Sequence, residues 1–344
     1  MYKLFRDLGI DLGTSNILFY ADGKGIVLRE PAVVAVNKND GSVLCVGSEA
    51  KRMLGRTPGN IEAVRPMRSG VITDYDMTEK LLAAFFRRTV GYSLVRPRAV
   101  ISVPSGITEL EERSVIQAAL EAGARRVYLI EKPLAAARGA GMDFSGPSGH
   151  MVVDISSGIT DIAVLTMDGV ATSSTVRVGG DSFNDAIVSY ARKRHNMLIG
   201  FETAEQVKIA AGCAVERPDE RTAQMKGRDL KTGMPREETV TSTELFEVFR
   251  RPARQIVDEV LAVLEQTSPE LVADLTQNGI LLTGGGSLLW GMAELVSQRT
   301  GLPCRVADDP ASCVANGCGK SLRWIRHMQE GTIHLARRKL MQEN

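Results

Sequence analysis

Two stretches of the chain share one pattern: an apolar run ends in Asp, a turn of small residues follows, and a second β-prone run returns. The first is LGIDLGTSNILFY over residues 8–20, and the second is MVVDISSGITDIAVL over residues 151–165, one domain length later. Apolar and β-branched runs joined by a short turn predict a β-hairpin. A P-loop or a dinucleotide-binding motif would instead lead from a strand into a helix. The repeat therefore predicts two related domains, each built around one hairpin.

The turns of these hairpins carry residues that suit a phosphate group. Gly and Ser positions let backbone N–H groups converge on one point, which makes a nest for an anion. Asp11 and Asp154 stand at the two hairpin mouths, where a carboxylate can hold a hydrated Mg²⁺ ion through its waters. Two such hairpins facing each other would hold the phosphates of one nucleotide between two domains. The alternative is two ordinary β-turns in a duplicated fold, and the repeated Asp argues against it.

The segments between the hairpins alternate between helix and strand signals. Helical periodicity is present over residues 79–90 and 108–124, and the second of these segments opens with a capping box. Residues 96–105 and 126–132 read as strands. Strands that alternate with helices predict an α/β domain with a substantially parallel sheet.

The region after the second hairpin predicts three more helices and a small lobe. The helices are expected over residues 181–195, 203–215 and 243–267, with a break or kink at Pro252 in the last. Residues 216–238 are polar and rich in turn residues, so we expect them to form a small peripheral lobe.

A third glycine signal lies in GILLTGGGSLL over residues 279–289, where a strand leads into three glycines and then a helix. Consecutive glycines let a ligand lie directly on the backbone, and a helix N-terminus favours anionic groups. Alone, this motif is weak evidence for a ligand site. It is stronger evidence here because two other glycine-containing turns of the chain also suit a ligand.

Composition narrows the class of protein. A chain of 344 residues is too long for one average domain, so we expect two, each with its own core. The formal net charge of +1 gives no support to nucleic-acid binding, which needs a basic excess. Aromatic residues make up only 5%, which argues against base-stacking surfaces. Trp290 and Trp324 are expected to fill the core or an interface.

Cysteine usage and the lack of targeting signals point to a cytosolic protein. The five cysteines are scattered, and we expect reduced, packed thiols and no zinc site. No apolar run near the first residue suits a signal peptide, and none approaches the ~20 residues that span a bilayer. We therefore expect a cytosolic protein that can still touch a membrane from the cytosolic side.

The order of DLGTSN, VVDISSGITD, TAEQVK and LLTGGGS resembles the actin/sugar-kinase/heat-shock-chaperone ATPase superfamily. Stretches such as GKGIVLREPAVVAV, VPSGITELEERSV and KGRDLKTGMPR are similar to the bacterial actins MreB and Mbl, from about residue 7 to 325. The resemblance implies an α/β fold of duplicated actin-like (ribonuclease-H-like) domains that flank a nucleotide cleft, each with a smaller lobe. We expect domain I over residues 1–145, domain II over 146–325 with its small lobe at about 182–250, and a basic tail over 326–344.

The resemblance also implies a site for ATP or ADP with Mg²⁺. Asp11 and Asp154 would hold the metal through water. The two phosphate loops, the nucleoside-contacting pair and the adenosine-side loop would be formed by Gly13, Thr14, Ser15, Asn16, Ser156, Ser157, Gly158, Ile159, Glu205, Lys208, Gly284, Gly285, Gly286 and Ser287.

Two positions depart from the family pattern. The family reads Glu-Glu-Pro where this chain has Glu131-Lys132-Pro133, and it has a catalytic Thr where this chain has Ile159. A charged ammonium cannot accept a proton from water and an isoleucine cannot hydrogen-bond one, so we expect weak or absent ATPase activity. Lys132 can instead neutralise the γ-phosphate. The alternative is that Glu131 replaces the missing acid.

The resemblance implies paired filaments under the cell membrane that guide cell-wall synthesis and cell shape. Leu94 and Val95, within residues 91–98, would enter the bilayer; the alternative is that this segment is a partly buried connector to the next strand. The tail at 326–344 is expected to be a solvated helix first and a docking segment second. Expected partners are further copies of the chain, a paralogous MreB-type protein, the inner face of the membrane and the wall-synthesis machinery. The alternative is a non-polymerising pseudo-ATPase that regulates a typical filament. A sugar kinase or chaperone is disfavoured.

Overall fold

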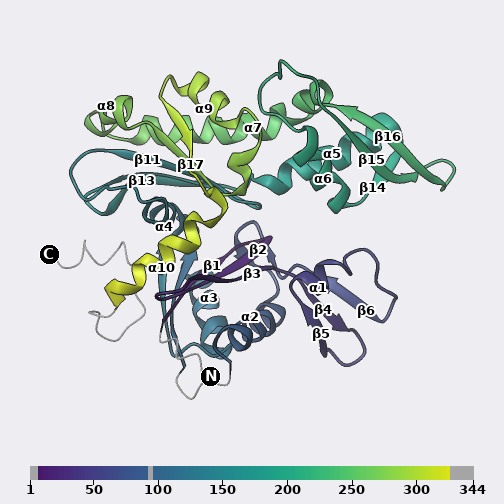
Figure 1. The fold of residues 1–344 in the computed structure, drawn as a ribbon, viewed down its shortest axis with the longest axis horizontal. Helices are drawn as coiled ribbons and strands as arrows, with labels where there is room; N and C mark the ends of the chain where they lie inside the picture. Colours follow the sequence, from purple (N-terminus) through teal and green to yellow (C-terminus); the bar gives the residue numbers. More distant parts are fainter. Residues whose placement is uncertain (1–6, 92–95, 326–344) are drawn as a thin grey trace.

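The computed structural model describes residues 7–91 and 96–325, which form two α/β halves stacked on each other (Figure 1). The first half is built on a five-stranded sheet with the order β10-β9-β1-β2-β3. Its strands are β1 (Asp7–Leu12), β2 (Asn16–Ala21), β3 (Gly25–Pro31), β9 (Arg98–Val103) and β10 (Arg126–Glu131).

The second half repeats this arrangement in the order β13-β12-β11-β17-β18. In both sheets the hairpin pairs antiparallel, and its first strand pairs parallel with a strand from further along the chain. The predicted hairpins and the predicted α/β fold with two related halves are confirmed. The strands are β11 (His150–Ile155), β12 (Thr160–Thr166), β13 (Gly169–Val176), β17 (Ile280–Thr283) and β18 (Cys304–Val306).

Helices α2 (Tyr75–Val90) and α3 (Glu109–Glu121) cover the first sheet and close its core. Helix α2 starts before the predicted residue 79 because Asp74 caps it by accepting a hydrogen bond from the N–H of Met77. The predicted capping box of α3 is present. In this core the ring of Phe19 meets two aromatic rings of α2 edge-on, a favoured geometry for aromatic pairs.

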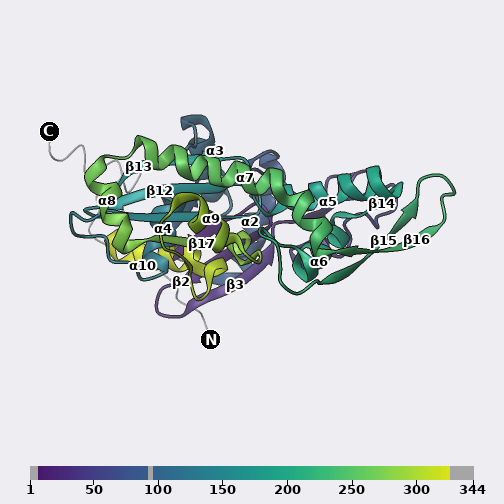
Figure 2. The same ribbon diagram turned by 90° about the horizontal axis from the view of Figure 1, so that it is seen from above.

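The long helix α7 (Ser242–Gln266) packs on β12 and β13 and continues toward the second small lobe (Figure 2). The break expected at Pro252 is wrong, because α7 runs through it without interruption. A capping box at its start and the burial of apolar side chains such as Phe249 and Ile256 offset the ~3 kcal/mol that an internal proline costs. Helices α8 (Pro269–Asn278) and α9 (Met292–Thr300) complete this layer.

Each half carries a smaller lobe. The first lobe comprises β4 (Val34–Asn37), β5 (Val43–Val46), α1 (Ser48–Lys51) and β6 (Ile61–Val64), and a short hairpin of β7 (Met67–Arg68) and β8 (Val71–Ile72) follows. The second lobe comprises α5 (Gly180–His195), β14 (Met197–Ile199), α6 (Phe201–Ala211), β15 (Thr222–Asp229) and β16 (Pro235–Thr241).

The polar segment at residues 216–238, expected to form a small lobe, lies in the second lobe, and most of it forms two paired strands. Its polar character reflects a sheet with one exposed face. Ala223, Met225 and Val240 point into the core of the lobe, and the alternating positions are mostly polar and exposed.

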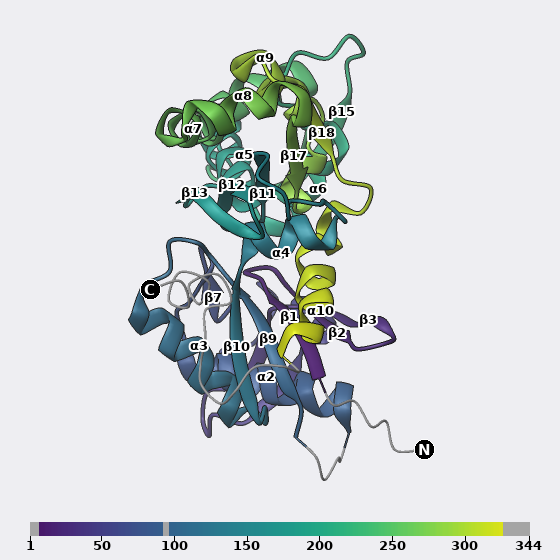
Figure 3. The same ribbon diagram turned by 90° about the vertical axis from the view of Figure 1, so that its left-hand side faces the viewer.

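Two short helices, α4 (Lys132–Gly139) and α10 (Cys313–Ile325), lie between the halves and cross each other closely (Figure 3). At the crossing, a Cβ atom on Gly139 would overlap the carbonyl of Cys313, and one on Gly317 would overlap the carbonyl of Ala135. The backbones can approach this closely only because both positions lack a side chain.

Several sequence-based expectations lie outside the described residues, namely Leu94 and Val95 as membrane contacts and the helix expected in the tail at 326–344. The domain boundaries at residues 145 and 325 stay predictions. Within residues 7–91 and 96–325, no helix combines the length and the apolar character needed to cross a membrane.

We predict that Gly317→Ala lowers the free energy of unfolding by about 1–3 kcal/mol, because the added methyl group overlaps a backbone carbonyl that cannot move freely. Helix propensity alone would make the alanine variant more stable by ~1 kcal/mol. A loss of stability would therefore show that the added methyl group overlaps the carbonyl. Denaturant unfolding followed by circular dichroism measures it. The control is Gly59→Ala, at a position with open space around it; equal effects of the two substitutions would contradict the close crossing.

Candidate nucleotide site

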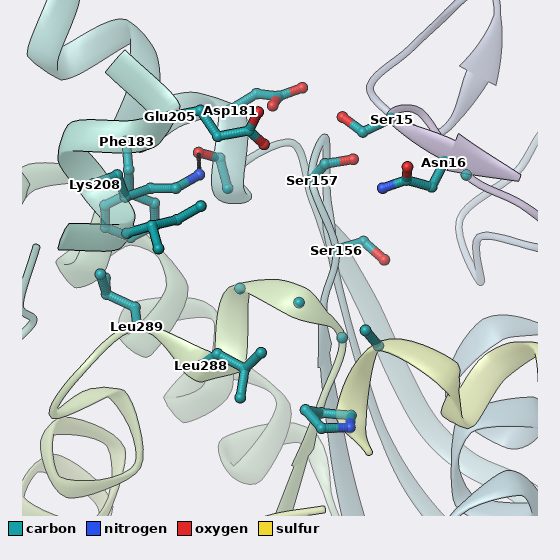
Figure 4. Close-up of a pocket in the computed structure, with 18 of the residues that line it drawn as sticks. Ser15, Asn16, Ser156, Ser157, Asp181, Phe183, Glu205, Lys208, Leu288 and Leu289 are labelled. Carbon is teal, nitrogen blue, oxygen red and sulfur yellow. Dashed lines mark hydrogen bonds between the residues drawn. The ribbon is translucent and has the colours of Figure 1, made fainter. Parts of the chain in front are cut away.

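A cavity of about 590 Å³ lies between the two halves. Its walls come from both hairpin turns, the start of α5, helix α6, the three-glycine loop and the start of α10. Figure 4 shows Ser15 and Asn16 of the first hairpin across the cavity from Ser156 and Ser157 of the second. The sequence repeat thus places its two turns on opposite sides of one space.

Not every residue of the predicted phosphate loops lines this cavity. Gly13, Ser15, Asn16, Ser156 and Ser157 do.

The other predicted members of the two loops, Thr14, Gly158 and Ile159, lie outside the cavity lining. Thr14 is buried and its hydroxyl accepts a hydrogen bond from the N–H of Gly70 at 3.0 Å. A Cβ atom on Gly158 would lie against Thr14 and Ser69, so the tips of the two loops touch below the cavity. The side chain of Ile159 is 1% exposed and reaches toward Gly70.

The two repeated aspartates line the cavity and have partners already. Asp11 Oδ1 accepts a hydrogen bond from Ser102 Oγ at 2.8 Å. Asp154 Oδ2 accepts one from Ser156 Oγ and Oδ1 one from Thr283 Oγ1, both at 2.8 Å. Each of the two carboxylates therefore already accepts at least one hydrogen bond from a hydroxyl group of the protein.

Lys132 lies behind these aspartates, not in the cavity wall, because it is the first residue of α4 and its side chain is only 2% exposed. Its Nζ is 3.4 Å from Asp11 Oδ1. The expectation that Lys132 neutralises the γ-phosphate stays a prediction, and from this position the ammonium would act from behind Asp11. Glu131, the possible substitute for the missing acid, also lies outside the cavity lining.

Charge around Lys132 decides the protonation of this buried group. Burial lowers the pKa of Lys132, but the carboxylates of Asp11, Asp154 and Asp161 raise it, and the net result is above the ordinary value. Burial raises the pKa of Asp154, and Lys132 lowers it in part. Burial likewise raises the pKa of Asp161 to about 7, against a hydrogen bond from Thr175 that lowers it. Lys132 is thus a charged ammonium at neutral pH.

The predicted nucleoside pair lies on one face of α6 at the opposite end of the cavity (Figure 4). Lys208 Nζ donates to the carbonyl of Gly180 at 2.9 Å, which ties α6 to the start of α5. Glu205 Oε2 lies 3.4 Å from Lys51 Nζ of the first small lobe. This ion pair and the pair between Arg56 and Glu202 join the two lobes across the cleft.

The three-glycine loop forms one wall as predicted, but a short 3₁₀ helix, η1 (Gly285–Leu288), precedes the expected α-helix. Gly284 has a φ of +78° and a Cβ there would overlap the carbonyl of Ile155. Ser287 lies outside the cavity lining, and its hydroxyl donates to the carbonyl of Gly284 at 2.7 Å. A second 3₁₀ helix, η2 (Pro310–Ser312), leads into α10.

Several lining residues were not predicted from the sequence. Asp181 and Phe183 lie in the first turn of α5, where VGGDSF is a Gly-rich helix start that could have drawn attention to them. Burial raises the pKa of Asp181 to about 6. Trp290, which was expected to fill the core or an interface, lines the cavity instead. The guanidinium of Arg217 lies 4.4 Å from the centroid of its ring. No local sequence pattern predicts this contact.

Cysteine chemistry plays no part in this site. All five cysteines are unpaired thiols, as predicted. Across residues 7–91 and 96–325, no group of three or more His, Cys, Asp or Glu side chains is arranged to hold a metal ion.

Comparison with known proteins identifies the family. The family model described as MreB/Mbl protein matches residues 5–330. The chain belongs to the MreB/Mbl family. It is 47% identical over 336 residues to the cell shape-determining protein MreB of Escherichia coli K12, covering 94% of this chain and 97% of that protein. It is 46% identical over 318 residues to the cell shape-determining protein Mbl of Bacillus subtilis 168, covering 92% and 96%.

Solved structures confirm the actin-like fold of this MreB/Mbl chain. MreB5 of Spiroplasma citri, in a crystal structure with bound AMPPNP, superposes with a TM-score of 0.89 at 35% identity, covering 94% of this chain and 98% of that one. The MamK double helical filament matches with a TM-score of 0.78 at 21% identity, covering 94% and 99%, and supports the fold alone.

The raised pKa of Asp161 predicts that stability falls as the pH rises. Its folded pKa of about 7 exceeds the ordinary 3.8, so the folded state binds the proton more tightly between these values, and ionisation opposes folding. Raising the pH from 5 to 8 should remove stability on the order of a few kcal/mol. Asp161→Asn should flatten this loss, since an amide oxygen can still accept from Ser105 and Thr175.

Denaturant unfolding at several pH values measures the slope for the chain and the variant. Asp143→Asn is the matched control, because hydrogen bonds from Ser145 hold the pKa of Asp143 below its ordinary value and outside this window. An unchanged slope in Asp161→Asn would contradict the assignment.

Proposed function

We propose that the chain is a nucleotide-binding, actin-like cytoskeletal protein whose filaments lie at the inner face of the cell membrane and organise cell-wall synthesis and cell shape. Membership of the MreB/Mbl family supports this proposal. The observation that carries the nucleotide part is the cavity between two repeated hairpin turns, the arrangement that the internal repeat predicts.

The walls of the cavity offer distinct environments for the parts of ATP or ADP. Backbone N–H groups of the two turns, with the hydroxyls of Ser15, Ser156 and Ser157, provide donors for phosphate oxygens. The start of α5 adds a helix N-terminus on the same side. Phe183 and Leu289 give the other end an apolar surface that suits a base. The related MreB5 of Spiroplasma citri has been crystallised with both AMPPNP and ADP.

We further propose that hydrolysis is weak. The position where the family has the water-directing acid is held by the ammonium of Lys132, which is buried behind Asp11 and carries no lone pair. Ile159, at the position of the family's catalytic threonine, is apolar and 1% exposed. Neither side chain can accept a proton from an attacking water. The proposal includes no magnesium ion, because the Lys132 ammonium already lies against Asp11, one of the two carboxylates expected to hold it.

Partners follow from the same proposal. Further copies of the chain would form the filament, and a paralogous MreB-type protein can share it. Leu94 and Val95 would contact the bilayer, which brings the filament to the wall-synthesis machinery.

Electron microscopy of the purified chain with ATP on a lipid layer tests assembly. We expect straight paired filaments that lie on the lipid. The variant Leu94→Ser, Val95→Ser should still assemble in solution but leave the lipid, because the apolar contact is lost. Leu110→Ser, at an exposed apolar position on α3, is the matched control and should stay on the lipid. Absence of filaments in all conditions would favour the non-polymerising regulator.

A phosphate-release assay tests hydrolysis. With ATP and Mg²⁺, the chain should release phosphate at least about 100-fold more slowly than E. coli MreB assayed in parallel, since loss of a positioned proton acceptor costs a factor of this order. A rate equal to that of the E. coli protein would contradict weak hydrolysis and would point to Glu131 as the acid.

A further inference from the structure

We propose that the Lys132 ammonium takes the charge-neutralising place of a divalent cation, so that this cavity binds the polyphosphate of a nucleotide without magnesium. The inference rests on the proposed nucleotide site and goes further, because it assigns the ionic form of the ligand. It starts from one contact, the 3.4 Å between Lys132 Nζ and Asp11 Oδ1.

Two carboxylates facing a phosphate need a cation. Asp11 and Asp154 both line the cavity between the hairpin turns, and their negative charges would repel a nucleotide's phosphates at this range. In a metal-dependent site a hydrated Mg²⁺ ion removes this repulsion by binding the carboxylates and the phosphates together. A fixed positive charge of the protein, placed behind the same carboxylates, would also reduce their repulsion of the phosphates.

Lys132 is such a charge, and its position holds it there. The side chain is 2% exposed and enters from the first residue of α4, so it cannot turn to solvent. A cation at a helix N-terminus is opposed by the helix dipole, and the ion pair with Asp11 at 3.4 Å compensates for it. The ammonium is therefore held beside this carboxylate.

The donor set does not fit a magnesium ion beside this ammonium. Mg²⁺ requires near-octahedral oxygen ligands and keeps several waters. Both oxygens of Asp154 already accept hydroxyl hydrogen bonds, and Asp11 Oδ1 accepts from Ser102 while facing Lys132. A dication placed against the same carboxylates would meet a like charge that cannot leave.

Calorimetric titration of the full chain with ADP, in EDTA and in MgCl₂, tests the proposal. We expect the two dissociation constants to agree within about threefold. Binding that weakens more than about tenfold in EDTA would overturn the inference and leave the proposed nucleotide site standing. No binding in either condition would overturn both.

A substitution assigns the effect to the ammonium. Lys132→Met keeps most of the length of the side chain and removes its charge, so it should weaken ADP binding at least about tenfold in EDTA, and MgCl₂ should restore it. Lys226→Met, an exposed position whose partner is Glu237 on the second lobe, is the matched control and should bind as the unchanged chain does. Metal-independent binding by Lys132→Met would overturn the role of Lys132.

Electron paramagnetic resonance of Mn²⁺ gives a second measurement that does not depend on affinity for ADP. The unchanged chain with ADP should leave the spectrum of Mn²⁺ like that of Mn²⁺ with ADP alone, whereas Lys132→Met should immobilise the ion on the protein. An immobilised ion in the unchanged chain would overturn the proposal. If Lys132→Met fails to fold, the EDTA comparison and this spectrum of the unchanged chain still decide it.

Discussion

The close crossing of α4 and α10 fixes how the two halves sit against each other. Both helices lie between the halves, and their backbones meet at Gly139 and Gly317, where no Cβ atom fits. Helix α4 begins with Lys132 directly behind the first hairpin, and α10 begins at the floor of the cavity. A wider crossing would separate the two turns and withdraw the ammonium from Asp11. Packing of small residues therefore sets the geometry of a charged site.

The buried ammonium makes the site sensitive to any change of charge. Taking an ammonium out of water costs several kcal/mol, and an ion pair offsets this only when its partners are well placed. Lys132 has Asp11 in contact and two further carboxylates close enough to raise its pKa. Because these groups are buried, removing the single ammonium would leave Asp11 and Asp154 without their counter-charge. The ion pair with Asp11 thus makes a buried lysine at this position compatible with the fold.

Local signals were enough to predict both hairpins, the capped start of α3 and the glycine loop, because turn chemistry and periodicity act over a few residues. They failed where tertiary packing decides. Burial of one face carries α7 through Pro252, and the alternation in β15 was hidden by its polar exposed side. The family pattern identified Lys132 and Ile159, but only the fold shows that both lie behind the cavity wall. Arg217 and Trp290 are far apart in sequence, and no local pattern could join them.

The contacts that join the two halves across the cleft are buried at its floor and exposed at its rim. This difference in burial determines where the two halves can separate. At the floor, the N–H of Ser105 in the first half donates to the buried carboxylate of Asp161 in the second half. At the rim, the lobes are joined by Lys51 with Glu205 and by a still more exposed pair. Exposed ion pairs contribute ~0–1 kcal/mol each. Separation at the rim therefore costs less than separation at the floor, where the hydrogen bond to Asp161 would be broken.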